Sequence, residues 1–202
     1  MIAGLTPEQA RALSALAPHL GSSFYLAGGV AVATYLHHRV SKDLDLFTPS
    51  ADPAALESAT LAIPGARVTA RAPGTLHLEI GGVPVSLLRY EYPDLHEPER
   101  TALPVPVASV DDLVAMKLSA IAGRGARRDF WDLFALLERT HRSLGEALQL
   151  FQRKFAQQDV GHVVRSLVYF ADAEAEPMPN GMTEGSWTQI RAWFEREVQA
   201  LA

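Results

Sequence analysis

Two adjacent glycines, Gly81 and Gly82, place the strongest constraint on how this chain of 202 residues can fold. They separate two segments, 75–80 and 83–90, in which apolar and polar residues alternate. A two-residue glycine loop between alternating runs predicts an antiparallel β-hairpin, because glycine readily adopts the positive φ that such a tight turn needs. The chain therefore has a β-sheet in its first half.

The same loop fixes which residues of the hairpin face each other. It pairs Ile80 with Val83 and His77 with Ser86, so that His77, Ser86 and Glu79 share one polar face. The other face is expected to be buried, because it is entirely apolar. Its members are Leu76, Leu78, Ile80, Val83, Val85 and Leu87.

The rest of the chain changes character near Ala108, after a stretch at 93–106 that contains four prolines. Apolar spacing predicts helices at 6–20, 30–37 and 53–61 and strands at 24–27, 44–47 and 68–71. Helices alone are expected afterwards, at 109–122, 126–140, from Ser143 onward, 163–174 and 187–201. We therefore expect an α+β fold in two parts, a core at 1–108 and a helical C-terminal subdomain at 109–202.

Composition excludes several classes of protein. The chain has no cysteine, which rules out disulfides and thiolate metal sites and fits a cytoplasmic location. We find no signal peptide and no apolar run long enough for a membrane span. The formal net charge of −5 argues against a strongly basic nucleic-acid platform over the whole chain. Short basic clusters occur at 37–42 and 124–128, where solvated faces are the alternative explanation.

Two aspartates alternate with leucines at 43–46, at the edge of a predicted strand. Side chains two residues apart on a strand share a face, so Asp43 and Asp45 point the same way while the leucines point into the core. Adjacent carboxylates repel each other unless a cation lies between them, and Mg²⁺ favours such oxygen ligands. The alternative is a solvated Asp-x-Asp turn.

Gly28 and Gly29 lie between a predicted strand and a predicted helix. Glycine backbone N–H groups beside a helix N-terminus can bind an anion. A tight turn that needs glycine only for steric reasons is the alternative. The sequence contains neither the Gly-x-Gly-x-x-Gly fingerprint of Rossmann folds nor the Gly-Lys-Ser/Thr of a P-loop at this place.

Taken together, the strand, the glycine pair, the helix and the Asp-x-Asp strand resemble the nucleotidyltransferase signature of the DNA polymerase β-like superfamily. The strings at 26–29 and 38–47 are similar to one branch of it, the AbiEii/AbiGii toxin family, which includes the MenT-type toxins. The resemblance implies a small mixed sheet with flanking helices. It also implies that Gly28 and Gly29 hold a triphosphate and that Asp43 and Asp45 bind Mg²⁺, with Mn²⁺ as an alternative. Arg39 and Ser41, in the same motif, are further candidate nucleotide contacts, although residues 37–39 could instead cap a helix.

A second block of sequence supports this resemblance. Lys117 falls inside the apolar stripe of its predicted helix, where an ammonium group needs an anionic partner or must reach solvent along its stem. Asp129 lies at the edge of the core face of the next helix, whereas Asp132 is expected on the surface. In the family that the strings at 116–121 and 124–133 resemble, the matching lysine and first aspartate border the active site. The resemblance thus implies that Lys117 contacts the triphosphate and that Asp129 orients Lys117 or assists the acceptor hydroxyl.

One position departs from the superfamily pattern. Many of its members place a third carboxylate on a neighbouring strand, and the matching position here is Ser86. Serine supplies no negative charge. His77 or Glu79 on the same face could substitute, and the alternative is that both are only the exposed face of a hairpin.

The resemblance implies a Mg²⁺-dependent nucleotidyltransferase that moves a nucleoside monophosphate from a triphosphate to an acceptor hydroxyl. The expected acceptor is the tRNA 3′ end, in a toxin with a cognate antitoxin, and the C-terminal subdomain is expected to complete the active-site cleft. Two other functions stay open. One is a nucleotide-binding module without catalysis, and the other is transfer to a protein or small molecule, which the acidic net charge favours.

Overall fold

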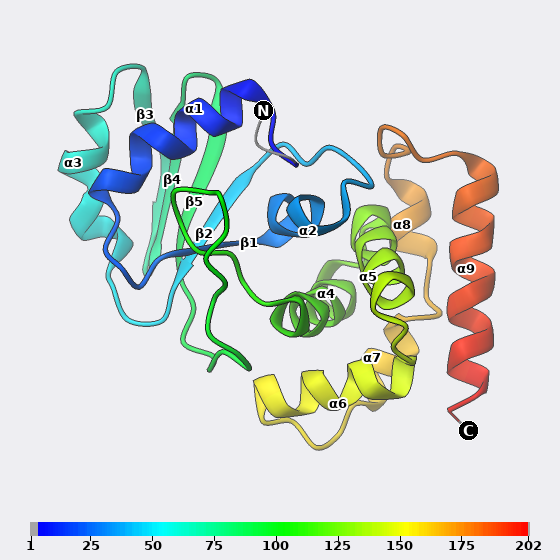
Figure 1. Ribbon diagram of the computed structural model, residues 1–202. Helices are drawn as coiled ribbons and strands as arrows, with labels where there is room; N and C mark the ends of the chain where they lie inside the picture. Colours follow the sequence, from blue (N-terminus) through cyan, green and yellow to red (C-terminus); the bar gives the residue numbers. More distant parts are fainter. Residues whose placement is uncertain (1–3, 202) are drawn as a thin grey trace. The chain divides into compact units, whose positions relative to one another are not determined.

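The computed structural model describes residues 4–201 and divides the chain into two compact units, Met1–Ser109 and Val110–Ala202. Figure 1 shows the elements of both units. Each unit contains its own set of buried apolar residues. The first unit holds every strand among the described residues, and the second consists of helices and their connections. The expected α+β class, with a helical C-terminal part, is confirmed.

The elements of the first unit follow the sequence pattern closely. Thr6 caps the first helix through a capping box with Gln9. His37 adopts a left-handed conformation and ends the second helix. The helices are α1 (Pro7–Leu16), η1 (Ala17–His19), α2 (Gly28–Leu36), η2 (Pro53–Leu56) and α3 (Glu57–Leu61), and the strands are β1 (Tyr25–Ala27), β2 (Leu44–Thr48), β3 (Ala66–Ala72), β4 (Thr75–Ile80) and β5 (Val83–Arg89).

The strands form one mixed sheet in the order β1-β2-β5-β4-β3. Strands β2 and β5 run parallel, and the other neighbouring pairs are antiparallel. The hairpin has the predicted register, with Ile80 opposite Val83 and His77 opposite Ser86. Because β5 is parallel to β2, the same register places Ser86 directly beside Asp45.

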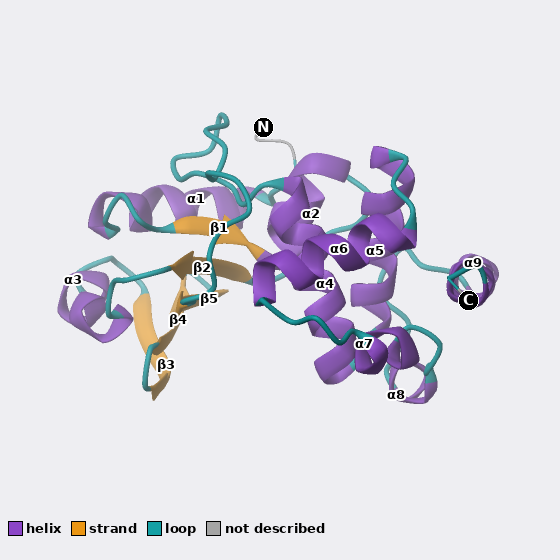
Figure 2. Ribbon diagram, turned by 90° about the horizontal axis from the view of Figure 1, so that it is seen from below, coloured by secondary structure: helices purple, strands orange, loops and turns teal. Residues whose placement is uncertain are grey.

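The two faces of this sheet differ in polarity. The apolar hairpin face is 0–6% exposed, as predicted, and packs with the leucines of β2. Helix α1 lies across the strands and α3 lies beside β3 (Figures 1 and 2). The opposite face carries Asp45, Ser86 and His77, all half-buried. The sheet therefore supplies a rigid platform with a polar side.

The second unit is built around α4, which packs against α5, α6 and α7. Phe130 of α5 forms an aromatic cluster with Phe170, Trp187 and Phe194, with ring centroids 5.3–5.8 Å apart. Among the described residues, none of the helices has both the length and the apolar character of a membrane span. The helices are α4 (Val110–Arg124), α5 (Arg127–Thr140), α6 (Leu144–Phe155), α7 (Gly161–Ser166), α8 (Ala171–Ala175) and α9 (Glu184–Gln199).

One predicted helix was wrong. The segment 163–174 forms two short helices, α7 and α8, joined by a turn at 167–170. Phe170, at the end of this turn, packs against Phe130 and Trp187. The burial of this aromatic ring outweighs the local helical preference of the segment. Periodicity within the segment gives no sign of that contact.

Candidate functional site

The glycine pair forms the junction between β1 and α2, and helix α2 begins at Gly28 itself, two residues earlier than expected. Gly28 has φ +66°, a left-handed conformation that side chains disfavour. A Cβ atom at Gly28 would also collide with the Asp45 carboxylate, which lies against this backbone. Glycine is therefore required here both by the turn and by the close approach of Asp45.

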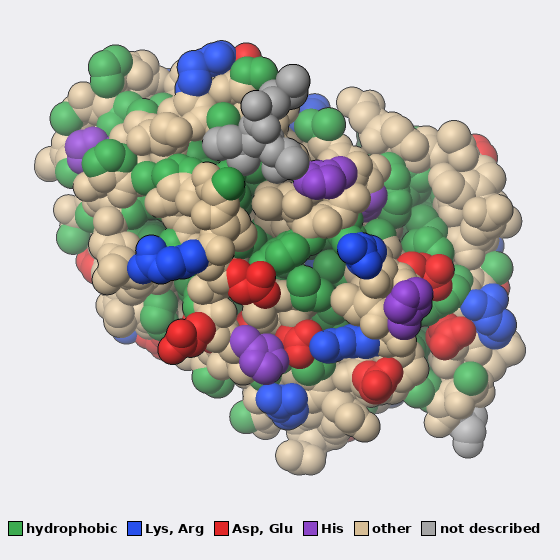
Figure 3. Space-filling view, in the orientation of Figure 1, with side chains coloured by type: hydrophobic (Ala, Val, Ile, Leu, Met, Phe, Trp, Pro, Cys, Tyr) green, Lys and Arg blue, Asp and Glu red, His purple; other side chains and the backbone are tan. Residues whose placement is uncertain are grey.

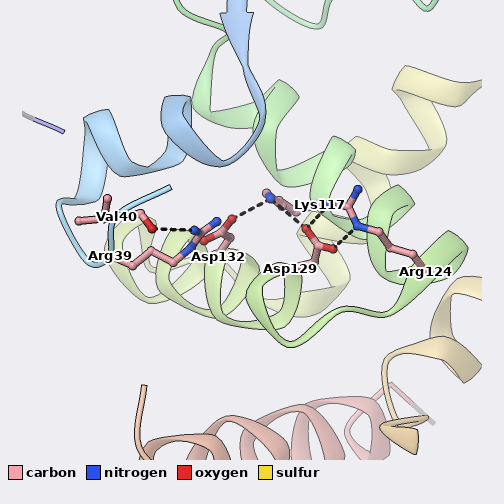
Figure 4. A network of polar contacts seen from close by, with 6 residues as sticks. All are labelled: Arg39, Val40, Lys117, Arg124, Asp129 and Asp132. Carbon is pink, nitrogen blue, oxygen red and sulfur yellow. Dashed lines mark hydrogen bonds and ion pairs between the residues drawn. The ribbon is translucent and has the colours of Figure 1, made fainter. Parts of the chain in front are cut away.

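Gly29 is packed just as tightly by a different pair of side chains. A Cβ atom there would lie 2.5 Å from Ser41 Oγ and 2.7 Å from Arg39 Nη2. Arg39 Nη1 also donates to the Val40 carbonyl at 3.4 Å (Figure 4). A guanidinium group and a hydroxyl thus converge on the N-terminal turn of a nine-residue helix, which is a favourable place for an anion.

The loop that carries Arg39 and Ser41 is held by a residue that sequence reasoning missed. Gln9 of α1 is 2% exposed, and its Nε2 donates to the carbonyls of Ser41 at 2.7 Å and Lys42 at 3.1 Å. Its Oε1 accepts from the backbone of Thr6. Gln9 therefore has two structural tasks, as part of the capping box with Thr6 and as the support of a loop 32 positions away.

The two aspartates lie at the start of β2, beside this glycine turn. Asp45 is half-buried within the strand, and Asp43 is exposed immediately before it. Within residues 4–201, no group of three or more histidine or acidic side chains is arranged to hold a metal ion. Mg²⁺ commonly takes one or two carboxylates and completes its shell with water and phosphate oxygens. The donor set of Asp43 and Asp45 therefore fits a metal that binds together with a phosphate.

Ser86 and His77 extend the polar row that begins at Asp45. His77 Nδ1 and Ser86 Oγ are 3.1 Å apart and share a hydrogen bond. Glu79 is engaged elsewhere, because Arg67 binds its two carboxylate oxygens at 3.0 and 2.8 Å. Of the two residues considered as substitutes for a third carboxylate, His77 is the one in contact with Ser86.

The second unit contains a buried charge network around Lys117 (Figure 4). Lys117 Nζ lies 3.0 Å from Asp129 Oδ1 and 2.7 Å from Asp132 Oδ2, and both aspartates are fully buried. Arg124 donates from Nε and Nη2 to Asp129 at 2.7 and 2.8 Å. The lysine amine does not reach solvent along its stem, and the expected pairing with Asp129 is present.

The prediction that Asp132 is a surface charge was wrong. Its carboxylate is turned inward to Lys117, so the lysine amine lies between the carboxylates of Asp129 and Asp132. Burial raises the pKa of Asp129, but the charges of Lys117 and Arg124 and their hydrogen bonds outweigh this, so its pKa lies below the ordinary value. Asp129 is therefore an anion at neutral pH.

A second buried ion pair in this unit was also missed. Lys154 of α6 and Asp112 of α4 are 0% and 2% exposed, and Lys154 Nζ lies 2.6 Å from Asp112 Oδ1. Neither residue was among the candidate site residues. No residue spacing could connect them, because they are 42 positions apart.

Comparisons with known proteins agree with this geometry. The model of the family described as "Nucleotidyl transferase AbiEii toxin, Type IV TA system" matches residues 11–69 and 55–200. An uncharacterised protein of Aquifex aeolicus (strain VF5) is 34% identical over 184 residues, which cover 88% of this chain and 87% of that protein.

Two solved structures share the fold. The nucleotidyltransferase toxin MenT4 of Mycobacterium tuberculosis H37Rv has a TM-score of 0.64 at 17% identity, with 96% of this chain and 82% of that chain covered. ANT(2")-Ia, solved with adenylyl-2"-tobramycin, has a TM-score of 0.53 at 16% identity over 73% of this chain and 97% of that one. The sheet with its glycine turn and aspartate strand, and the family match over nearly the whole chain, lead to one conclusion: this protein belongs to the AbiEii nucleotidyl transferase toxin family.

Proposed function

We propose that this protein transfers a nucleoside monophosphate from a nucleoside triphosphate to an acceptor hydroxyl. One observation carries the proposal: the Asp45 carboxylate lies against Gly28 in the first turn of α2, while Arg39 and Ser41 lie against Gly29. A carboxylate that could bind a metal and a turn that could bind an anion thus lie side by side, although the residues are separated in sequence. This combination suits a metal-bound triphosphate.

Each residue of this group has a separate task in the proposed reaction. Asp43 and Asp45 would hold Mg²⁺, or Mn²⁺, which supplies charge neutralisation at the phosphates when bound. Gly28 and Gly29 let the backbone approach the triphosphate closely. Arg39 donates to phosphate oxygens and Ser41 offers its hydroxyl, which orients the α-phosphorus for attack.

We also propose roles for Lys117 and Asp129 of the second unit. Lys117 contacts the triphosphate and stabilises negative charge that develops on it, and Asp129 orients the lysine amine. The support is that two buried carboxylates hold the Lys117 amine, which therefore has a fixed position.

The acceptor that we propose is the 3′ end of tRNA, with growth inhibition as the outcome in the cytoplasm and a cognate antitoxin as partner. Membership in a toxin family of a type IV system supports this assignment. A protein or a small molecule is the second candidate acceptor. Two observations favour it: the adenylylated aminoglycoside bound to ANT(2")-Ia, and a surface on which basic and acidic side chains are interspersed on the visible face (Figure 3).

The test is a transfer assay with the intact protein. It is incubated with Mg²⁺, total tRNA and each α-labelled nucleoside triphosphate in turn, beside an Asp45→Ala variant. We expect label on RNA with one preferred triphosphate, and none with the variant. Label on protein or on a small molecule would instead identify the second acceptor class. Triphosphate binding without any transfer would contradict the proposal and leave a binding module.

A Gly28→Ala variant is expected to lose both transfer and triphosphate binding. An alanine at this position must keep the left-handed backbone conformation, which costs about 1–2 kcal/mol for a residue with a Cβ atom. Its methyl group also displaces the Asp45 carboxylate. Gly81→Ala is the matched control, since Gly81 has φ +58° and a Cβ atom there meets nothing within 4 Å. Melting curves should show similar destabilisation of the two variants. Equal activity of the two would show that the Gly28 contact has no part in the site.

A further inference from the structure

A row of three polar side chains crosses the sheet from β2, the strand that we propose to hold the metal. Asp45 on β2 lies opposite Ser86 on β5, and Ser86 lies opposite His77 on β4. Side chains in register on neighbouring strands project from the same face and are about 4.8 Å apart along the row. The flanking residues of these strands point to the other face, which is buried.

His77 has a hydrogen-bond partner in Ser86 and a small apolar neighbour on its other side. Its Nδ1 lies 3.1 Å from Ser86 Oγ, and its neighbour on β3 is Ala70. The nearest acid on its own strand, Glu79, is bound by Arg67 through two hydrogen bonds. On the tautomer that carries its proton on Nε2, Nδ1 accepts the Ser86 hydroxyl hydrogen.

We propose that Ser86 and His77 form a proton relay that removes the proton of the acceptor hydroxyl. This inference rests on the proposed function. A hydroxyl that lies against Ser86 is about one strand spacing from Asp45, where the triphosphate is expected. Ser86 alone is a poor base because a neutral hydroxyl oxygen has very little affinity for a proton, and the histidine behind it supplies the basic nitrogen.

The relay accounts for the proton that the acceptor hydroxyl loses in the transfer reaction. The acceptor oxygen forms a bond to the α-phosphorus, and the bond between that phosphorus and the leaving pyrophosphate breaks. The acceptor proton passes to Ser86 Oγ while the Ser86 proton passes to His77 Nδ1. The resulting imidazolium releases its proton to solvent before the next turnover. His77 thus acts through Ser86 and is a positioning and proton-accepting residue that does not touch the acceptor.

The test is a set of variants assayed with wild-type protein under saturating triphosphate. His77→Asn can keep a hydrogen bond to Ser86 but accepts no proton, and Ser86→Ala breaks the relay at its first member. Each should lower kcat about a hundredfold without changing the KM for the triphosphate. The double variant should be no slower than either single variant, because both members serve one step. His19→Asn, on the short helix η1, is the control.

The most specific test is whether a second substitution restores the activity that His77→Asn loses. Ser86→Asp places a carboxylate base at the same position, so the pair Ser86→Asp/His77→Asn should recover most of the lost kcat. Near-wild-type kcat for His77→Asn, additive losses in the double variant, or failure of the rescue would each overturn the relay. If transfer depends on Asp45 but not on His77, the proposed function stands and only the relay falls. If wild-type protein transfers nothing, both fall together.

Discussion

Asp45→Asn is expected to lower the rate of nucleotide transfer about a thousandfold. The substitution keeps the shape of the side chain but removes one of the two charges that we propose to hold the divalent ion. A bound metal contributes several kcal/mol of charge stabilisation in such reactions, and each 1.36 kcal/mol changes the rate tenfold. The measurement is kcat/KM for the triphosphate at fixed Mg²⁺, with wild-type protein alongside.

The control for this variant is Asp52→Asn. The Asp52 side chain caps η2 by accepting from the backbone of Ala54, and asparagine caps helices equally well. We expect unchanged transfer for Asp52→Asn and closely similar melting temperatures for both variants. Activity of Asp45→Asn within tenfold of wild type would show that this carboxylate does not carry the metal.

Lys117→Met is expected to destabilise the second unit by about 3–5 kcal/mol. The lysine is 5% exposed and balances two fully buried carboxylates, so its removal leaves excess negative charge in a region of low polarity. Methionine fills most of the same volume, which makes lost charge the main cause. Urea unfolding followed by circular dichroism measures the change in the free energy of unfolding.

Lys154→Met is the control that separates a loss of stability from a loss of nucleotide transfer. Lys154 is a second buried lysine of the same unit, paired with Asp112 at 2.6 Å, and its loss should cost a similar free energy. At a temperature where both variants remain folded, transfer should fall only for Lys117→Met. Equal transfer by the two variants would show that Lys117 has only a structural role.

Local sequence patterns were sufficient to predict much of the secondary structure and strand register of the first unit. The Gly81-Gly82 turn fixed the hairpin register, because a two-residue loop permits only one pairing of its strands. Alternation placed Asp45 on the face away from the core, since a strand repeats every two residues. Gly28 and Asp45 could both be named as candidates from motifs, but their contact could not, because it depends on how β1 and β2 pair.

What the sequence determined by itself was the order of elements, the polar and apolar faces of the strands, and the residues whose chemistry suits a metal-bound triphosphate. These features depend on spacings of two to four residues, which local geometry controls. Only the tertiary structure decided that Asp132 turns inward to Lys117, that Gln9 supports the Ser41 loop, and that Ser86 lies beside Asp45. The partner of a buried polar group comes from whichever distant segment packs against it. Because a buried polar group without a hydrogen bond is costly, the packing that supplies a partner is the stable one.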